Sequence, residues 1–509
     1  MRITNKMMTT NMMSNINRNK QNMSTRGDQY STGQKIQRPS EDPIVAVRDL
    51  KYDTNLTELN QYYEKNIPDA KSWMDISESA LDNINKMLTS MHTYCDQGAN
   101  DTLTVSDRDA IVETLAQYRE QIYQLGNSDY AGRYVFTGFR TDTSLIFQEE
   151  APDLEYMITE PLRAEELQQI PYVLGETKYE EGKTSAEYLS ENTALEYAYR
   201  FRLSYDSLNK DQEITIKYRT ADMTEEDEDL EMTFSAFSGD DASKKYEVEG
   251  DGHFLPETGE IILSGEQYDI LRNAVSISAT YDKVGFSKGE LRPEHYFDCT
   301  RYELEIDEEG NATRKETEDG GYMSTEYSNP LSQVIQYEIN FSQKLQVNTL
   351  AKDAISSTIG REIDEILSTI DQVAAIESKM ADVEKKLNDQ TIDEETRTAL
   401  TSLKGQMDNE YALWQKVLQE KFSMALTTTT NVQSQVNIAV ADLGSRYKRL
   451  ELTEQRLSSQ QVDFEEMIND NSSVEMEEAI INYSQAQVTY NASLQAASKV
   501  VKNTLLDFL

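Results

Sequence analysis

The beginning of the chain carries apolar side chains at alternating spacings of three and four residues, which is the pattern of an amphipathic helix. Before residue 33 this apolar seam is thin, and it consists of Met8, Met12, Ile16, Met23 and Tyr30. After residue 43 the seam is dense enough for a long coiled-coil-like helix, with members Leu56, Leu59, Tyr63, Ile67, Ala70, Met74, Leu81, Ile84, Leu88 and Met91. Pro68 interrupts this second helix and is expected to kink it.

A third helix is expected to end at Gly126. Ser106 and Asp109 have the spacing of a capping box at its start, and a glycine is a common helix terminator. The apolar face of this helix consists of Ile111, Leu115, Tyr118, Ile122 and Leu125. We expect the second and third helices to pack as an antiparallel pair.

The segment from Tyr30 to Pro43 predicts a break between the first and second helices. Gly33 can adopt the left-handed conformation that closes a helix, and Pro39 cannot donate to a helical ladder. Asp42 followed by Pro43 predicts a new helix start, with the carboxylate as N-cap and proline at the first helical position.

Helical periodicity is replaced by short alternating runs, glycines and aromatic residues between about Asn127 and Tyr327, which indicates a β-rich region. Ile214, Ile216 and Tyr218 alternate with polar neighbours, and the segment from Tyr302 to Asn311 has the composition of a hairpin turn. The acidic run from Glu225 to Glu231 is interpreted as a solvated loop.

Helical spacing returns from about Ser356, with one face formed by Ile359, Ile363, Ile366, Ile370, Val373, Met380, Val383 and Leu387. A break near residues 388–393, with Thr391 and Glu394 as a capping box, predicts a helical hairpin. Leu443, Leu450, Leu457 and Phe464 then repeat every seven residues. The last helix has few charges, and its seam is Met476, Ile480, Tyr483, Gln487, Tyr490, Leu494, Ala497, Val501, Thr504 and Phe508. A helix so poor in charge is expected to become ordered on assembly with partners.

The charge of the chain excludes some functions. A formal net charge of -42 argues against nucleic-acid binding, which needs clustered Lys and Arg. Residues 1–50 nevertheless hold eight basic and four acidic side chains, so either a basic arm pairs with an acidic body or this is an ordinary solvated face. No apolar run approaches the roughly 18 residues of a spanning helix, and the first thirty residues lack the apolar region of a secretory signal, so neither a membrane protein nor a cleaved signal peptide is expected.

The candidate chemical groups favour a protein that is not an enzyme and needs no cofactor. His295 and Cys299 are four residues apart, yet two ligands are too few for a structural metal site, so no metal is expected. Cys95 continues the seam of the second helix and is interpreted as a buried core thiol. No phosphate-binding loop, G-x-S-x-G or H-E-x-x-H motif is present, and three histidines leave little room for a catalytic triad.

Several motifs resemble the flagellin-like axial proteins of the bacterial flagellum. The segment from Tyr30 to Pro43 resembles the S-x-G-x-x-I-x-x-P-S-(D/E)-D-P joint of that family, which singles out Gly33, Ile36, Pro39, Asp42 and Pro43. Residues 127–138 resemble the motif N-S-x-Y-x-G-x-Y-x-F-x-G, and residues 347–349, the start and the ending Leu505 to Leu509 are also similar. The resemblance covers roughly residues 1–147 and 330–509, and Tyr30 stands where the family prefers Leu.

The resemblance implies a structural adaptor at the junction between hook and filament, on which the flagellin filament assembles. The implied partners are further copies of the chain in a ring, the first hook-associated protein on the hook side, flagellin on the filament side and a cytoplasmic export chaperone. It also implies export through the flagellar type III apparatus without a cleaved signal peptide, and an extracellular location in the flagellum.

The expected fold class is α+β, with long coiled-coil-like helices from both termini and a β-rich outer domain inserted between them. The expected divisions are residues 1–42 (N-terminal helix and joint), 43–147 (first helical half), 148–330 (outer domain), 331–475 (second helical half with a helical hairpin) and 476–509 (C-terminal helix). The expected assembly contacts are Met12, Ile16, Met23, Tyr483, Tyr490, Leu494, Val501 and Phe508. Two alternatives stay open: a filament-forming flagellin, and a surface binding protein or enzyme that uses the β-rich region.

Overall fold

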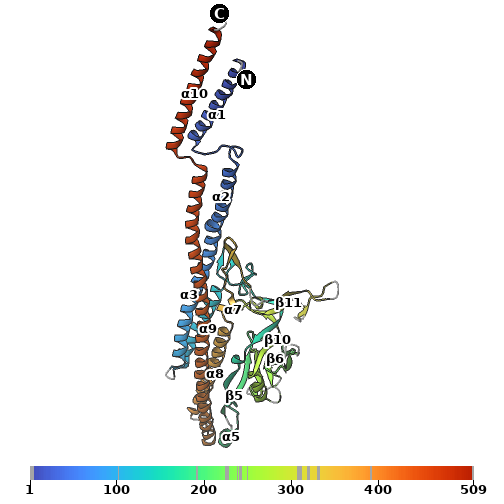
Figure 1. The fold of residues 1–509 in the computed structure, drawn as a ribbon. Helices are drawn as coiled ribbons and strands as arrows, with labels where there is room; N and C mark the ends of the chain where they lie inside the picture. Colours follow the sequence, from blue (N-terminus) through green and yellow to red (C-terminus); the bar gives the residue numbers. More distant parts are fainter. Residues whose placement is uncertain are drawn as a thin grey trace. The chain divides into compact units, whose positions relative to one another are not determined.

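The computed structural model in Figure 1 shows long helices from both ends of the chain and a β-rich middle, which confirms the predicted α+β class. It describes residues 5–100, 103–190, 193–223, 228–237, 239, 244–248, 250, 252–306, 312–317, 321–328, 333–389 and 392–506. The chain divides into two compact units. We call Met1–Lys71, Tyr337–Leu345 and Tyr447–Leu509 the terminal unit, and Ser72–Gln336 and Gln346–Arg446 the central unit.

The terminal unit contains α1 (Asn5–Thr32), α2 (Pro43–Gln61), α10 (Met476–Leu506) and the last part of α9 (Glu394–Ser472). Helix α2 passes through a five-residue π-helical segment, η1 (Tyr62–Asn66), into α3 (Ile67–Gly98). In this segment the amide of Ile67 donates to the carbonyl of Tyr62, one residue further back than in an α-helix. Pro68 brings no amide to the ladder, so the predicted interruption takes the form of a π segment directly before it.

A β-hairpin lies where the sequence predicted only the second helical half. It consists of β14 (Gln336–Asn340) and β15 (Gln343–Gln346). Ile339 and Leu345 are buried, and each follows an exposed charged residue and precedes a half-buried polar one. This alternation is the strand signal that the prediction for residues 331–475 overlooked. Phe341 meets the ring of Tyr62 edge-on, with centroids 5.5 Å apart, and Asn66 donates to the carbonyl of Glu338 over 2.8 Å.

The helices of the central unit bury most of the apolar seams that the sequence predicted. In α3 the side chains of Met74, Leu81, Ile84, Leu88, Met91 and Cys95 are all buried. Helix α4 (Val105–Leu125) packs against α8 (Thr358–Leu387), where the Tyr123 hydroxyl approaches Gly360, and it contacts α3 through Tyr94 and Tyr118, whose ring centroids are 6.0 Å apart. The short helix α7 (Ala351–Ala354) precedes α8.

Two details of α4 differ from the prediction. Its capping box is formed by Thr104 and Asp107, not by Ser106 and Asp109, and the Asp107 carboxylate accepts from both the amide and the hydroxyl of Thr104. Two pairs with the same spacing overlap here, and the helix starts at the earlier one. Gly126 ends the helix with a φ of -62°, so a glycine is not needed here for a left-handed backbone conformation. A Cβ there would lie 2.2 Å from Leu145, so the glycine permits close packing.

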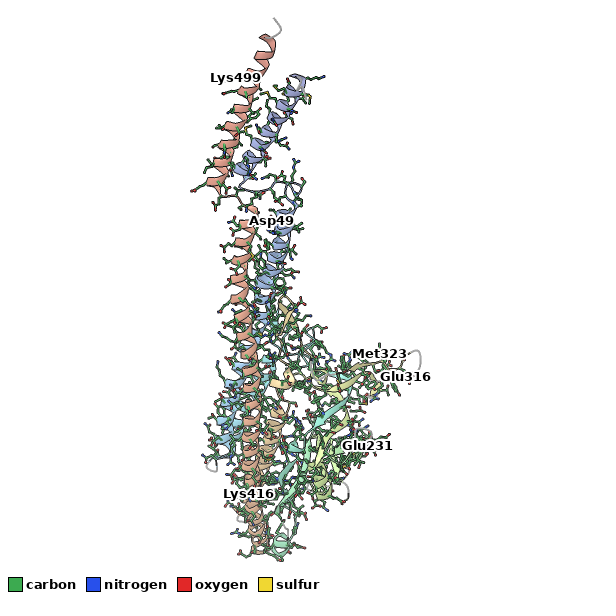
Figure 2. All side chains as sticks on the ribbon, viewed as in Figure 1. Asp49, Glu231, Glu316, Met323, Lys416 and Lys499 are labelled. Atoms are coloured by element: carbon green, nitrogen blue, oxygen red, sulfur yellow. The ribbon has the colours of Figure 1, made fainter. Side chains whose placement is uncertain are left out.

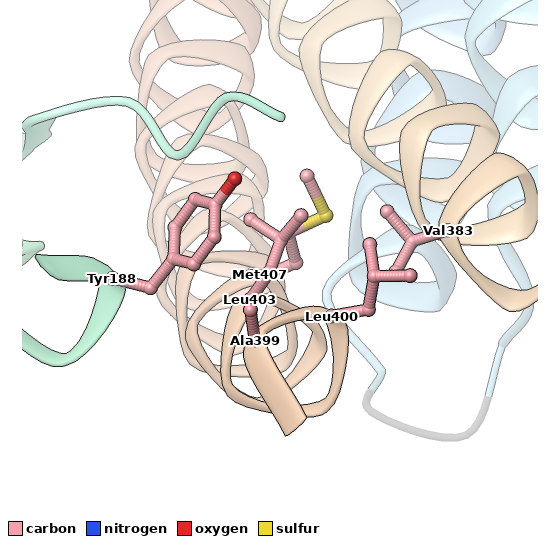
Figure 3. Close-up of a cluster of buried hydrophobic side chains, with 6 residues drawn as sticks. All are labelled: Tyr188, Val383, Ala399, Leu400, Leu403 and Met407. Atoms are coloured by element: carbon pink, nitrogen blue, oxygen red, sulfur yellow. The ribbon is translucent and has the colours of Figure 1, made fainter. Parts of the chain in front are cut away.

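Helices α8 and α9 form a helical hairpin whose contacts include a cluster of buried side chains (Figure 3). The cluster consists of Val383 on α8, of Ala399, Leu400, Leu403 and Met407 on α9, and of Tyr188 on α5 (Ser185–Ser190). Thr391 lies outside the described residues, and α9 is capped instead by Asp393, whose carboxylate accepts from the amide of Thr396 over 3.2 Å.

The β-rich region was also predicted, and in its described residues it consists mainly of two larger antiparallel sheets. The larger has the order β12-β11-β3-β10-β6-β7, with β13 also on β11. Its strands are β3 (Ala151–Leu162), β6 (Glu213–Thr220), β7 (Leu230–Ser235), β10 (Ala274–Phe286), β11 (Asp298–Ile306), β12 (Ala312–Arg314) and β13 (Ser324–Tyr327). The smaller sheet has the order β4-β5-β9-β8, with β4 (Gln168–Leu174), β5 (Ala194–Arg202), β8 (His253–Leu255) and β9 (Glu260–Leu263). The remaining elements are β1 (Asp129–Tyr130), β2 (Arg133–Tyr134), η2 (Ala164–Glu166), α6 (Gly265–Arg272) and η4 (Pro293–His295).

The predictions for individual strands had mixed outcomes. Ile214 and Ile216 are buried in β6, as their alternation predicted, and β11 and β12 form the hairpin predicted around residues 302–311. The acidic run was only partly a loop. Glu231 lies in β7 and pairs with Lys217 of β6, while residues 224–227 are outside the described part. Among the described residues, no helix has both the length and the apolar character needed to cross a membrane.

Candidate assembly interface

Helices α1 and α10 pack side by side in the terminal unit (Figure 1). The rings of Tyr30 and Tyr483 stack with centroids 5.9 Å apart, and a Cβ at Gly27 would lie 3.2 Å from the Tyr483 ring. Among the described side chains of these two helices, Ile16 and Ala479 alone are buried. Large apolar side chains remain exposed on both helices, namely Met7, Met8, Met13, Met476, Ile480, Ile481, Val488 and Leu494. The pair therefore leaves much of its apolar surface in water.

The two chain segments that connect these helices to the rest of the terminal unit run beside each other. The amide of Lys35 donates to the carbonyl of Ser472 over 2.7 Å, and the amide of Val474 donates to the carbonyl of Gly33 over 2.8 Å. The Lys35 ammonium also reaches the carbonyl of Asp470. Backbone hydrogen bonds thus connect the two chain segments, so residues 33–35 and 472–474 form one structural joint.

The predicted conformations in this joint are present. Gly33 has a φ of +72° and directly follows the end of α1. The Asp42 carboxylate accepts from the amides of Ile44 and Val45 over 3.0 and 3.2 Å, and Pro43 is the first residue of α2. Ile36 is half-buried and Pro39 is exposed. Further along α2, the carboxylate of Asp49, labelled in Figure 2, accepts from the Asn471 amide over 3.4 Å.

The predicted assembly contacts differ in how much of each side chain is covered within the chain. Ile16 is buried and Tyr483 packs against α1, so both already have contacts within the chain. Met12, Met23 and Tyr490 are half-buried on α1 and α10. Leu494 has 41% of its surface exposed, which leaves it available to a partner. The side chains of Val501 and Phe508 lie outside the described residues.

The central unit has a different kind of contact between its smaller sheet and its helices. Six buried or nearly buried charged residues form what we call the ionic cluster: Arg200, Arg202, Glu260, Glu362, Glu365 and Lys421. The fully buried Arg200 guanidinium pairs with Glu260 on β9 and binds both carboxylate oxygens of Glu365 on α8 over 2.8 and 2.7 Å. Three cations thus face three carboxylates. This cluster joins β5 and β9 to α8 and α9.

Charge balance inside the ionic cluster explains its pKa shifts. Burial opposes ionisation of Glu365, but the cations Arg200, Lys421 and Arg202 outweigh it and hold the pKa of this carboxyl well below its usual range. Burial lowers the pKa of Lys421 to about 8, since the attraction of Glu365 is offset by repulsion from the two arginines. Glu365 is therefore ionised in the folded protein at neutral pH.

A cavity of about 470 Å³ lies beside the ionic cluster and is one place where a binding function of the β-rich region could reside. Its charged lining is largely engaged: Glu176 pairs with Lys379 and Lys178, and Arg361 pairs with Asp206. Burial raises the pKa of Glu410, whose carboxylate accepts from the Thr177 amide over 2.9 Å. These contacts join the β-rich region to the helices.

His295 and Cys299 lie on a 3-10 turn and a strand, not on one helix, so the spacing of four residues does not put them on a common helical face. Both side chains are buried. Burial lowers the pKa of His295 to about 4, and its Nε2 lies 3.0 Å from the Ser144 carbonyl. Burial raises the pKa of Cys95 to about 12, so this thiol is a protonated core residue. Within the described residues, no group of three or more His, Cys, Asp or Glu side chains could hold a metal ion.

Sequence reasoning missed the ionic cluster and the C-terminal half of the joint. The charged residues of the cluster come from four segments that are far apart along the chain (200–202, 260, 362–365 and 421), so no local pattern shows that they meet. Ser473 and Val474 carry no strong turn signal, although they precede the periodic segment that begins at Met476. A signal did exist for α6, because Ser264 and Gln267 have capping-box spacing and form that box in the structure.

Residues 3–141 match the profile of the bacterial flagellin N-terminal helical region. The chain is 30% identical over 145 residues to flagellar hook-associated protein 3 of Salmonella typhimurium, which is 28% of this chain and 45% of that protein. It is also 30% identical over 126 residues to a flagellin of Clostridium tyrobutyricum, which is 25% of this chain and 33% of that protein. The chain thus spans less than half the length of these two curated relatives.

The chain also aligns with a solved structure. The crystal structure of FlgL from Xanthomonas campestris aligns over 82% of this chain and 99% of that one, at 13% sequence identity and a TM-score of 0.30. The flagellin-like resemblance inferred from the motifs is confirmed for the N-terminal part of the chain by the profile match. Since the profile ends at residue 141, the resemblance stated for residues 330–509 remains a prediction.

Proposed function

We propose that this chain is a structural component of the bacterial flagellum and serves as an adaptor at the junction between hook and filament. The observation that carries the proposal is the match of residues 3–141 to the flagellin N-terminal helical region, on a chain whose two terminal helices pair and leave apolar side chains in water. The similarity to a hook-associated protein 3 favours the junction over the filament itself.

Burial of apolar surface supplies the driving force for assembly in this proposal. Removing apolar surface from water stabilises by about 25 cal/mol per Å², and helices that bury few side chains in one copy gain most from neighbours. The exposed residues of α1 and α10 include Met13, Ile481 and Val488, each more than half exposed. Contacts with several neighbours would offset the entropy lost when the ends of the chain become ordered.

The proposed partners follow from the junction position. They are further copies of this chain in a ring, the first hook-associated protein towards the hook and flagellin towards the filament. A cytoplasmic chaperone and the flagellar type III apparatus would deliver the chain to its extracellular site without cleavage of a signal peptide. The function is non-enzymatic and needs no cofactor, nucleic acid or membrane.

Deletion of the gene tests the proposal directly. Electron microscopy of the source cells should show hooks without filaments, and flagellin should appear in the medium, because subunits would be exported without a base on which to assemble. Restoring the wild-type chain should restore the filaments. Intact filaments on every hook of the deletion strain would refute the junction role.

The predicted contacts on α10 have their own test. Leu494→Asp combined with Val501→Asp places two charges on the seam of this helix, and we expect a folded central unit but no incorporation into the flagellum. Asn491→Asp combined with Gln495→Glu is the matched control, since it adds the same charge at two exposed polar positions. Equal incorporation of both double variants would refute the assignment of this α10 seam to the assembly interface.

A filament-forming flagellin is the second candidate, because a flagellin of Clostridium tyrobutyricum shares the same 30% identity, although over 126 residues against 145 for the hook-associated protein. Purified flagellin polymerises into long filaments, whereas a junction protein should stop at small assemblies. Electron microscopy of the concentrated, purified chain separates the two, and long filaments would favour the flagellin.

A further inference from the structure

Helix α2 has two apolar faces, and within the part of the chain that the structure describes one of them is packed and the other is exposed. Its inner face contains Leu59, which is fully buried, and is tied to α9 by a hydrogen bond from the Asn471 amide to the Val45 carbonyl over 3.1 Å. On its outer face Ile44, Val47 and Leu50 are 66%, 66% and 70% exposed. A surface helix normally turns a polar face towards water, so a second apolar stripe indicates a second partner.

Two cations accompany the outer stripe. Arg48 lies four residues after Ile44, and Lys51 lies four residues after Val47, so each cation neighbours an apolar member on the helix surface. Both are exposed, and neither forms an ion pair with any residue that the structure describes. We call Ile44, Val47, Arg48, Leu50 and Lys51 the basic stripe.

The end of α9 carries a surface of the opposite charge in the same unit. Val462 and Met467 are 61% and 47% exposed. Glu466 follows Val462 by four residues and Asp463 precedes Met467 by four, which puts a carboxylate beside each apolar side chain. The two carboxylates are exposed, and neither has an ion-pair partner within the described part of the chain. We call Val462, Asp463, Glu466 and Met467 the acidic stripe.

The two stripes cannot satisfy each other within one molecule. Helices α2 and α9 contact through their inner faces, where Gln461 donates to Asn60 over 3.1 Å and Asn471 reaches Val45 and Asp49. The stripes lie on the opposite, exposed sides of the same helices. The basic stripe and the acidic stripe therefore cannot meet within one molecule. The basic stripe of one copy is, however, complementary in charge to the acidic stripe of a second copy.

We infer that the basic stripe of one copy docks on the acidic stripe of the next copy. This inference rests on the proposed function and gives the ring an interface outside the terminal helices. The contact is heterologous, since different surfaces meet, and repeated heterologous contacts close into rings or continue as helical arrays. The few apolar side chains of the two stripes bury less than the roughly 800 Å² per partner of a standard interface. The stripe contact would therefore add to the contacts of the terminal helices and not replace them.

Crosslinking of the purified full-length chain identifies the occupant. A photoreactive amino acid at Val47, in concentrated protein at low salt, should yield a species of twice the mass whose linked peptide contains residues 462–467 of another copy. Adding flagellin to a parallel sample offers the competing partner. A link to flagellin, a link within one chain, or no link would each overturn the inference.

Charge exchange tests the electrostatic part in the same experiment. Arg48→Glu with Lys51→Glu should lower the yield of the linked species by about tenfold, and so should Asp463→Lys with Glu466→Lys, because like charges then face each other. Combining all four changes should restore the yield to near the original value. The control is Lys65→Glu with Lys416→Glu, two exposed cations outside both stripes, and it should change nothing. Four combined changes that fail to restore the yield would refute charge pairing between the stripes.

These outcomes are independent of the deletion experiment. Bare hooks in the deletion strain, together with an unlinked Val47 probe, would support the junction function and refute the contact between the stripes. Intact filaments in the deletion strain, together with the linked species, would keep the contact between copies and remove the junction function.

Discussion

The terminal pair α1 and α10 and the central unit solve the packing problem in opposite ways. In the described part of the terminal pair the buried side chains are Ile16 and Ala479, and apolar residues such as Val488 stand in water. The central unit buries most of its apolar seams and also encloses the six charges of the ionic cluster. The difference indicates that the central unit is stabilised by its own contacts, whereas the terminal helices leave exposed the apolar surface that the proposed assembly would bury.

The largest expected effect is in the ionic cluster. Arg200→Leu leaves the carboxylates of Glu260 and Glu365 buried without their main partner, and we expect a loss of about 3–5 kcal/mol in the free energy of unfolding of the central unit. Chemical denaturation measures this loss. The control is Lys385→Met, which removes an exposed pair with Asp382 and should leave the transition where it is. Equal midpoints for the two variants would contradict the idea that the cluster holds the sheet to the helices.

The next effect compares one buried side chain from each region. Leu403 is fully buried in the cluster of Figure 3. Leu403→Ala should lower the free energy of unfolding by about 3 kcal/mol, because the substitution leaves a cavity. Ile16→Ala should leave the main unfolding transition of the isolated protein unchanged but reduce its incorporation into flagella. Leu189→Ala, at an exposed position, is the control for Leu403. A large loss for Ile16→Ala in the isolated chain would erase the contrast between the regions.

The third effect concerns pH. His295 has a folded pKa of about 4, against about 6.5 in an unfolded chain, so between these values only the unfolded state binds the proton. Stability therefore falls as the pH drops from 6.5 to 4, by about 3 kcal/mol in total, and is fully present above pH 6.5. Unfolding curves of the wild type and of His295→Gln should show a shallower pH dependence for the variant. The carboxylates are common to both proteins, so parallel curves would mean that His295 titrates normally.

The smallest effect is at the joint. Asp42→Ala removes the carboxylate that accepts from Ile44 and Val45, and we expect a loss of about 1 kcal/mol in local stability at the start of α2. Hydrogen exchange of the peptide that contains these amides should become faster, while Asp42→Asn should keep most of the protection. Unchanged exchange in the alanine variant would show that Pro43 alone is sufficient to start the helix.

The sequence by itself determined the elements whose causes are local. Apolar spacing predicted the buried faces of α3 and α8, and the Asp42–Pro43 pair predicted the start of α2, because helix capping and periodicity act over a few residues. Where two local signals competed, as with Thr104 and Ser106, the sequence could not choose between them. It also overlooked the β14–β15 hairpin, since the alternation there is short.

Only the tertiary structure decided which distant segments meet. Arg200 and Glu365 are 165 residues apart, and the joint links Lys35 to Ser472, so neither contact leaves a mark in any local window. The same holds for the two faces of α2: the sequence shows that Val45 and Val47 are both apolar, but the fold decides that Val45 is half-buried while Val47 stays 66% exposed. The physical reason is that burial depends on what packs against a helix, and helical spacing alone does not specify that neighbour.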